Sequence, residues 1–144
     1  MSEPVLFYER RFYCFSNFSS FQVVIWGEVW MTSEHAYQAQ KFITRKDIQA
    51  KIQDARSAHD AKVIAREHAF FTHSGWEKEK LEVMEDICRA KLEQHEFIQK
   101  RLRETGDGEI IEDSPKDSFW GWGPNQTGHN YLGKIWMKLR DEME

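Results

Sequence analysis

The segment TSEHAYQAQKF, residues 32–42, brings a carboxylate, an amide and an amine together in one short stretch, at Glu34, Gln38 and Lys41. If Thr32 caps a helix that begins at the next residue, each residue turns by about 100° and the three polar side chains share one stripe. A carboxylate beside an amine is suited to acid–base or nucleophilic chemistry. A solvated surface helix shows the same pattern, so the spacing alone leaves both interpretations open. The residues expected on the opposite, apolar side are Ala36, Ala39 and Ile43.

Two other segments carry polar side chains among aromatic residues. FSNF, residues 15–18, sets Ser16 and Asn17 between two phenylalanines, and such a pair can read a base or ribose or can close a turn. The segment 113–134, DSPKDSFWGWGPNQTGHNYLGK, contains four of the eight glycines and has the character of a long loop, either binding or structural. Asn130 is expected to cap the helix that follows, whose free N–H groups favour an anion such as phosphate.

Short strands and helices are expected to position these segments. The predicted strands lie at residues 5–8 and 109–112 and in a hairpin over 22–31 that turns at Gly27-Glu28. The predicted helices cover residues 33–43, 46–54, 57–67, 76–95, 96–105 and about 130–143. The helix over 76–95 has the longest apolar repeat and is expected in the core, through Leu81, Met84, Cys88 and Leu92. This balance predicts an α+β fold, mostly helical with a small β-sheet.

Composition limits the class of protein. A chain of 144 residues fits one domain with one core. The net charge of -4 provides no overall field toward nucleic acid or an anionic membrane, although a local phosphate site remains compatible with it. Cys14 and Cys88 are the only cysteines and no His/Cys cluster has zinc-ligand spacing, so no metal is expected. The absence of an 18-residue apolar run and of a leader at Met1 predicts a cytosolic protein, or a nuclear one in a cell with a nucleus.

Taken in order, these segments resemble the NADAR family, and within it most closely the YbiA-like N-glycosidases. The motifs that carry the resemblance are FSNF, W-x-TSEHAYQAQKF from Trp30, VM and AKLEQH within residues 83–95, DSFWGWG at 117–123, and G-x-N-x-LG-x-x-WMKLR at 128–140. They occur in the family's order, without a large insertion, from about Val5 to the C-terminus. The resemblance implies one compact NADAR domain over residues 1–144.

The resemblance also implies an activity. Family members are hydrolases of N-glycosidic bonds that need no metal or other cofactor, and their substrates are small and nucleotide-like or are ADP-ribosylated guanines in nucleic acid. The two substrate types are ribosylamino-pyrimidine phosphates of riboflavin biosynthesis and guanine bases with ADP-ribose on the amino group. In both, ribose C1 is bonded to an exocyclic amino nitrogen. No membrane and no obligate protein partner is implied. The alternatives are a non-catalytic module that binds ADP-ribose or a nucleotide, and a scaffold whose helix 33–43 is solvated.

The resemblance assigns the catalytic chemistry to three residues. Glu34, at the family's Ser-Glu-His position, is the first choice for acid–base work. Lys41 either attacks C1 after ring opening to give a Schiff base or holds a phosphate or ribose hydroxyl. Asp117 is the second carboxylate and would orient water or the ribose diol.

The remaining positions are expected to bind the substrate. Trp120 would stack on the base, while Gly121 and Gly123 would allow close backbone approach. The other residues expected to contact the ring, the sugar or the phosphate are Ser16, Asn17, Phe18, Gln38 and Asn130.

Overall fold

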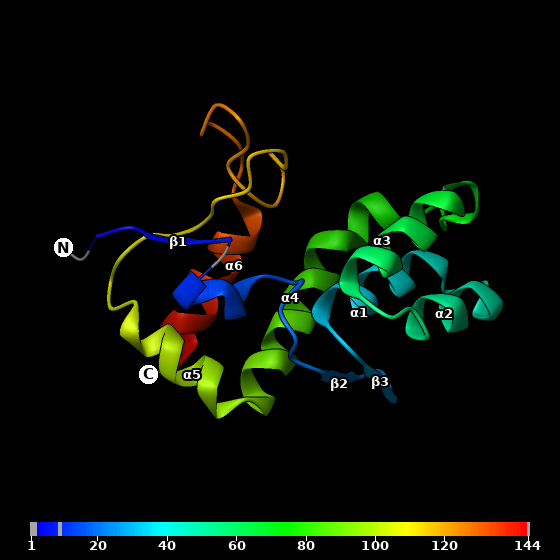
Figure 1. Ribbon diagram of the computed structural model, residues 1–144, viewed down its shortest axis with the longest axis horizontal. Helices are drawn as coiled ribbons and strands as arrows, with labels where there is room; N and C mark the ends of the chain where they lie inside the picture. The colour runs from blue at the N-terminus through cyan, green and yellow to red at the C-terminus, as the bar shows by residue number, and fades with distance from the viewer. Residues whose placement is uncertain (1–2, 9, 144) are drawn as a thin grey trace. The chain divides into compact units, whose positions relative to one another are not determined.

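The structure, a computed structural model, describes residues 3–8 and 10–143 (Figure 1). It divides into two compact units, one formed by Met1–Ser16 with His95–Glu144 and the other by Asn17–Gln94. Helices dominate both units and each has one two-stranded sheet, which agrees with the α+β class. The single domain expected over residues 1–144 stays a prediction.

The first unit pairs the two ends of the sequence. Its elements are β1 (Val5–Phe7), the 3-10 helix η1 (Arg10–Phe15), α5 (Glu96–Glu104), β4 (Ile110–Glu112) and α6 (Tyr131–Glu142). Strand β1 runs parallel to β4, with Val5 opposite Ile110. The Phe15 ring lies 5.7 Å from the Phe7 ring and 5.1 Å from the Trp136 ring, and all three residues are fully buried. The Trp136 indole N–H donates to the Phe15 carbonyl (3.0 Å), so α6 is anchored to the N-terminal segment.

The second unit is a hairpin followed by a helical cluster. Its elements are β2 (Val23–Ile25), β3 (Glu28–Trp30), α1 (Ser33–Ala39), the 3-10 helix η2 (Gln40–Phe42), α2 (Lys46–Gln53), α3 (Ala58–Glu67), the 3-10 helix η3 (Ala69–Phe71) and α4 (Trp76–Gln94). Helix α1 contacts α2, α3 and α4, which lie around it in Figure 1. The Gln94 side-chain amide exchanges two hydrogen bonds with the Val24 backbone (2.9 and 2.8 Å). The end of α4 therefore holds the hairpin.

Three local predictions are wrong. The hairpin turns at Trp26-Gly27, because Ile25 pairs with Glu28 and both turn residues have positive φ (56° and 76°), as the favoured two-residue turns require. Leu81 is 40% exposed, since it lies on the outer face of α4, whereas Met84, Cys88 and Leu92 are buried as expected. The division of the first helix into a polar front and an apolar back also fails: every residue of α1 is buried and Ile43 is exposed.

The described residues contain neither a candidate membrane-spanning helix nor a candidate metal-binding cluster. No helix in the part of the chain that the structure describes is both long enough and apolar enough to cross a membrane. Within residues 3–8 and 10–143, no group of three or more His, Cys, Asp or Glu side chains is arranged to hold a metal ion.

Candidate active site

Helix α1 begins at a side-chain cap, as predicted. Thr32 has an extended backbone (φ -143°, ψ 167°) and its hydroxyl oxygen accepts from the His35 backbone N–H at 3.2 Å. This arrangement places Glu34 in the first turn, where the partial positive charge of the helix N-terminus favours a carboxylate. The sequence therefore fixes the position of the predicted catalytic acid through a local signal.

Glu34 and Gln38 form a buried pair. The Gln38 amide donates to the Glu34 carboxylate at 2.6 Å, and the two residues are only 6% and 4% exposed. The Glu34 backbone N–H donates to the carbonyl of Asn17 at 3.0 Å, which attaches the FSNF segment to α1. A solvated scaffold helix would carry these side chains in water, so their burial contradicts that alternative.

Three buried side-chain oxygen atoms of the second unit, one of them on Gln38 itself, have no protein hydrogen-bond partner. Among the described residues, Asn17 Oδ1, Gln38 Oε1 and Ser33 Oγ are inaccessible to solvent and have no hydrogen-bond partner. The Asn17 side-chain amide donates to the Met84 sulfur at 3.4 Å, and a thioether sulfur is a weak acceptor. Because buried polar groups in native proteins are nearly always paired, these acceptors lack a donor that the protein itself does not supply.

Lys41 lies on η2 and is half-buried. Burial lowers the pKa of its amine below 10.5; the Glu34 charge opposes this shift, while the positive charges of Lys62 and Lys80 add to it. A lowered pKa raises the fraction of neutral amine, which is the form that attacks carbon. The Lys41 amine also lies 5.7 Å from the centre of the Tyr37 ring. Lysine and carboxylate thus interact electrostatically within one unit.

His35 connects the start of α1 to the turn after α2. It is fully buried, its Nε2–H donates to the Ala55 carbonyl at 3.0 Å, and its Nδ1 accepts from the Thr32 hydroxyl at 2.7 Å. A carbonyl can only accept, so the ring is the neutral Nε2–H tautomer. The sequence motif included this histidine but gave no reason for it, and the structure assigns it to holding Glu34's helix in place.

The burial of His35 predicts a pH-dependent stability. Burial lowers the pKa of this imidazole below 6.5. Below pH 6.5 the His35 imidazole is protonated in the unfolded chain but stays neutral in the folded chain. The free energy of unfolding is therefore greatest above pH 6.5 and falls as the pH drops toward the folded pKa. Urea unfolding at a series of pH values measures this slope. In His35→Gln, the free energy of unfolding should lose this part of its dependence on pH. The control is His59→Gln, at an exposed position of α3, which should keep the wild-type dependence. Equal slopes in the wild type and both variants would contradict the assignment.

In the first unit, Asp117 organises the loop between β4 and α6. One oxygen of its carboxylate accepts from the backbone N–H groups of Phe119 (2.9 Å) and Trp120 (2.8 Å). The Trp120 ring is half-buried and meets Phe119 edge-to-face at 4.8 Å. Asp117 therefore has a structural task in shaping the Trp120 turn, whatever it does to a substrate.

The glycines of this loop permit close packing of the chain on itself. A Cβ at Gly121 would lie 2.8 Å from the Glu112 carbonyl oxygen, and Gly123 has φ +72° with a Cβ position 2.8 Å from the Ser118 side chain. The sequence predicted close backbone approach at both glycines and attributed it to a ligand. In the structure the close approach is to Glu112 and Ser118, and contact with a substrate stays a prediction.

Asn130 differs from the prediction. It precedes α6 in a left-handed conformation (φ 54°, ψ 42°) and its side chain makes no capping bond. Its amide instead accepts from Glu112 N–H and donates to the Ile110 carbonyl (both 2.9 Å), so it holds β4. The N–H groups of the first two helical residues donate to loop carbonyls of Phe119 and Trp120, so a phosphate at this helix start would have to replace those bonds.

The predicted site residues therefore fall into two groups. Asn17, Glu34 and Gln38 are joined by hydrogen bonds, and Lys41 senses the Glu34 charge. Phe18 belongs to the same unit, with the Lys62 amine 6.0 Å from its ring. The predicted residues of the other unit are Ser16, Asp117, Trp120, Gly121, Gly123 and Asn130.

Sequence reasoning did not find Lys62 and Lys80. Both act on Lys41, but they come from α3 and α4, far away in the chain, and neither lies in a recognisable pattern. Met84 was expected only as a core residue of the helix over 76–95, and its contact with Asn17 gives it a second role.

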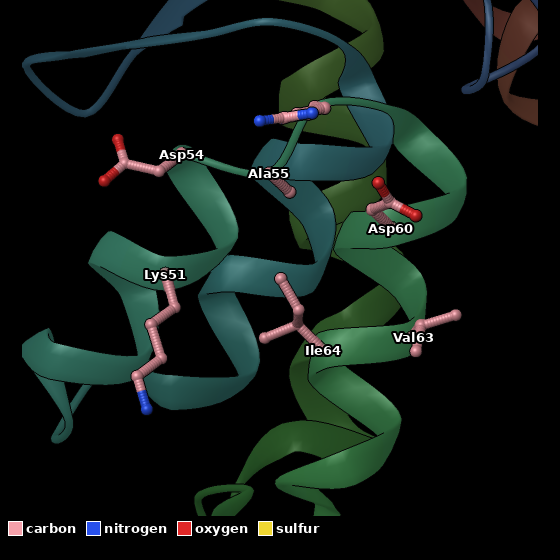
Figure 2. A pocket seen from close by; sticks show the side chains of 7 residues that line it. Lys51, Asp54, Ala55, Asp60, Val63 and Ile64 are labelled. Atoms are coloured by element: carbon pink, nitrogen blue, oxygen red, sulfur yellow. The ribbon is translucent and has the colours of Figure 1, made fainter.

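A separate pocket of about 530 Å³ lies at the ends of α2 and α3 and contains none of the predicted site residues (Figure 2). Asp54 and Asp60 stand on its two sides, with Ile64 between them. Ala55, which accepts from His35, is part of its lining.

Comparison with known proteins identifies the family. The NADAR domain family model matches residues 6–144, so the chain belongs to the NADAR family, as the motifs predicted. The chain is similar to the "N-glycosidase Npun_R5314" of Nostoc punctiforme, with 39% identity over 132 residues, which are 90% of this chain and 85% of that protein. It is 35% identical to the "N-glycosidase YbiA" of Escherichia coli over 129 residues, 90% of this chain and 80% of that protein.

A longer relative and a solved structure complete the comparison. The "Riboflavin biosynthesis protein VVA0006" of Vibrio vulnificus is 37% identical over 146 residues; the match spans this whole chain but only 40% of that protein. The solution NMR structure of E. coli YbiA superposes with a TM-score of 0.87 at 32% identity, covering 99% of this chain and 86% of that one. The predicted α+β fold is therefore confirmed.

Proposed function

We propose that this NADAR-family N-glycosidase hydrolyses the bond between ribose C1 and an exocyclic amino nitrogen of a guanine-like ring. The chain is a hydrolase that acts on N-glycosyl compounds, as the names of its relatives state for them. The observation that carries the finer proposal is the buried Glu34–Gln38 pair together with two unpaired amide oxygens: Gln38 Oε1, within the pair, and Oδ1 of Asn17, whose backbone carbonyl accepts from Glu34. Ribose hydroxyls and a ring amino group are the donors that these acceptors lack.

Glu34 is suited to the proton transfers of this reaction. When the C1–N bond breaks, its electrons go to nitrogen, which needs a proton, while C1 gains cationic character. A buried carboxyl group next to C1 can deliver that proton and then remove one from the attacking water. The water oxygen becomes the new C1 hydroxyl, so the products are a free sugar and a free amine. Gln38 holds the Glu34 carboxylate in one orientation at 2.6 Å.

Lys41 supports a covalent variant of the same reaction. After the ribose ring opens, its neutral amine adds to C1 and displaces the ring amine, which leaves an imine between Lys41 and the sugar. Water then hydrolyses the imine and restores the amine. The lowered pKa of Lys41 raises the neutral fraction of its amine, which is the form that this path requires.

Two substrate classes share this reacting centre: guanine with ADP-ribose on its amino group, and ribosylamino-pyrimidine phosphates of the riboflavin pathway. The second class agrees with the name of the Vibrio relative. In either class, Trp120 would stack on the ring and Asp117 would orient water or the ribose diol, roles that add to its bonds within the loop.

A panel of purified compounds tests the proposal. ADP-ribosylated guanosine, the riboflavin intermediates and GMP are incubated with the protein under one set of conditions, and mass spectrometry follows the free sugar and the free base. We expect cleavage of at least one amino-linked compound and no cleavage of GMP, whose ribose is bonded to a ring nitrogen. Rapid cleavage of GMP would contradict the proposal. Binding of the amino-linked compounds without turnover would favour the non-catalytic nucleotide-binding module.

A further inference from the structure

Lys62 of α3 carries a positive charge that no carboxylate of the described residues neutralises in an ion pair. Its side chain is exposed, and its amine lies 6.0 Å from the centre of the Phe18 ring. An aromatic ring attracts a cation but leaves the hydrogen bonds of the amine for solvent or a ligand. Lys80, the other lysine whose charge acts on Lys41, is by contrast paired with Glu77 at 2.7 Å. Lys62 is therefore the one of these two lysines whose charge an incoming anion can use.

Two predicted site residues locate the Lys62 amine at the candidate active site. Phe18, whose ring it approaches, directly follows Asn17, and the Asn17 carbonyl accepts from the Glu34 backbone N–H at 3.0 Å. The Lys62 charge also acts on Lys41, so the amine is within electrostatic range of the predicted nucleophile. Helix α3, which carries Lys62, contacts α1, which carries Glu34. Lys62 thus joins the site from a segment that the sequence motifs do not contain.

The lysines at this site lack a counter-ion of their own. Lys41 and Lys62 repel each other, and in the part of the chain that the structure describes neither forms an ion pair. Glu34 and Glu77 act on Lys41 with the opposite sign, but each of these carboxylates already accepts from another side chain, at 2.6 and 2.7 Å. Like charges within range of each other are unfavourable. An anion that binds beside them would offset this repulsion.

The proposed substrates bring such an anion. In both substrate classes the ribose that reacts at C1 also carries a phosphate. A lysine ammonium is a compact charge with three rotatable donors, which suits phosphate oxygens. The start of α6, the place predicted for a phosphate from the sequence, already uses its N–H groups for loop carbonyls. The second unit therefore offers a cation for the phosphate that this helix start does not.

We propose that Lys62 binds the phosphate on the ribose of the substrate and leaves Lys41 to react at C1. The inference rests on the proposed function and adds the residue that recognises the phosphate. It makes Lys62 a residue that sets specificity, because a compound without the phosphate loses this contact while its reacting bond is unchanged.

A binding experiment tests the inference without turnover. NMR titration of the isotope-labelled protein measures its affinity for ribose 5-phosphate and for ribose, and the wild type should bind the phosphate more tightly. Lys62→Gln should weaken the binding of ribose 5-phosphate by about 5- to 10-fold, the effect of one hydrogen bond to a charged group, reduced for an exposed lysine. Lys62→Arg keeps the charge and should retain most of the affinity. The control is Lys51→Gln, at an exposed position of α2, which should bind like the wild type.

Kinetics separate phosphate recognition from an electrostatic effect on Lys41. The compound that the panel identifies is compared with the same compound after enzymatic removal of its phosphate. Loss of the Lys62 charge changes the pKa of Lys41 for both compounds alike, so this effect cancels in the ratio of their kcat/KM values. The ratio of phosphorylated to dephosphorylated compound should fall about 5- to 10-fold in Lys62→Gln and stay within about twofold of wild type in Lys51→Gln.

An unchanged ratio in Lys62→Gln would overturn the inference, and so would equal affinity of the wild type for ribose and ribose 5-phosphate. The proposed function is judged separately. If the panel shows no turnover while the binding of ribose 5-phosphate depends on Lys62, the proposed function fails and the phosphate site stands. If an amino-linked compound is cleaved but the ratio does not depend on Lys62, the proposed function stands and the phosphate site fails.

Discussion

Glu34→Gln is expected to lower kcat by about 10²- to 10⁴-fold, the usual contribution of a positioned proton donor or acceptor. The substitution keeps the shape of the side chain and an oxygen that can still accept from the Gln38 amide, so folding and most of the ligand affinity should remain. The KM of an amino-linked substrate should therefore change much less than kcat. Steady-state kinetics on the compound that the panel identifies, with thermal unfolding of both proteins, measure the effect.

The chain offers a matched control for this substitution. Glu28 accepts from the Gln53 amide at 3.0 Å, which reproduces the Glu–Gln contact on the exposed hairpin. Glu28→Gln should leave kcat unchanged. Full activity in a folded Glu34→Gln protein would remove Glu34 from the mechanism, and an equal loss in both variants would show that the assay reports stability instead of chemistry.

Local signals in the sequence predicted much of the second unit. Thr32, predicted as a capping residue, marked the start of α1, and the cap is present. The apolar repeat of α4 was also recognised, although Leu81 was wrongly included because a wide stripe does not show where the buried face ends. The burial of Glu34 and Gln38 could not be predicted, since periodicity treats polar residues as a solvated face and only tertiary packing covers them.

The first unit shows where local rules fail. Asn130 was predicted as a helix cap because residues of its type favour that position. Its side chain instead forms hydrogen bonds with the backbone of β4, about twenty positions earlier in the chain. Capping preferences describe only neighbouring residues and cannot predict such a distant partner. Close backbone approach was predicted at Gly121, and the atoms that approach it within the chain belong to Glu112 and Asp117, while its contact with a substrate stays a prediction. In both cases the residue type was informative, and its partner depended on contacts between distant parts of the sequence.

The position of Lys41 could be predicted from the family motif, but its electrostatic state could not. The lowered pKa arises first from burial and then from the opposed effects of Glu34, Lys62 and Lys80. The two lysines reach Lys41 from separate helices, so no spacing in the sequence indicates them. The amine that the motif supplies is thus tuned by residues outside it.

Lys41→Arg is expected to abolish turnover if Lys41 attacks C1, because a guanidinium retains the positive charge but forms no imine with a sugar. A lysine that only holds a phosphate or a hydroxyl would tolerate the same change with a modest rise in KM. Lys46→Arg, at an exposed position of α2, is the matched control and should remain fully active. Substantial activity in Lys41→Arg would exclude the covalent path.

Trapping and pH dependence give independent tests of the same amine. Borohydride added during turnover should reduce the imine and leave a sugar adduct whose mass maps to Lys41, and no adduct should form on Lys46. Only the neutral amine attacks, so kcat/KM should fall as the pH drops through the pKa of Lys41, which burial sets below 10.5. The Glu34 charge raises this pKa. In Glu34→Gln, the residual kcat/KM should therefore begin to fall at a lower pH than the kcat/KM of the wild type does. A pH profile that is the same in both proteins, with no trapped adduct, would reduce Lys41 to a binding residue and leave Glu34 to activate water directly.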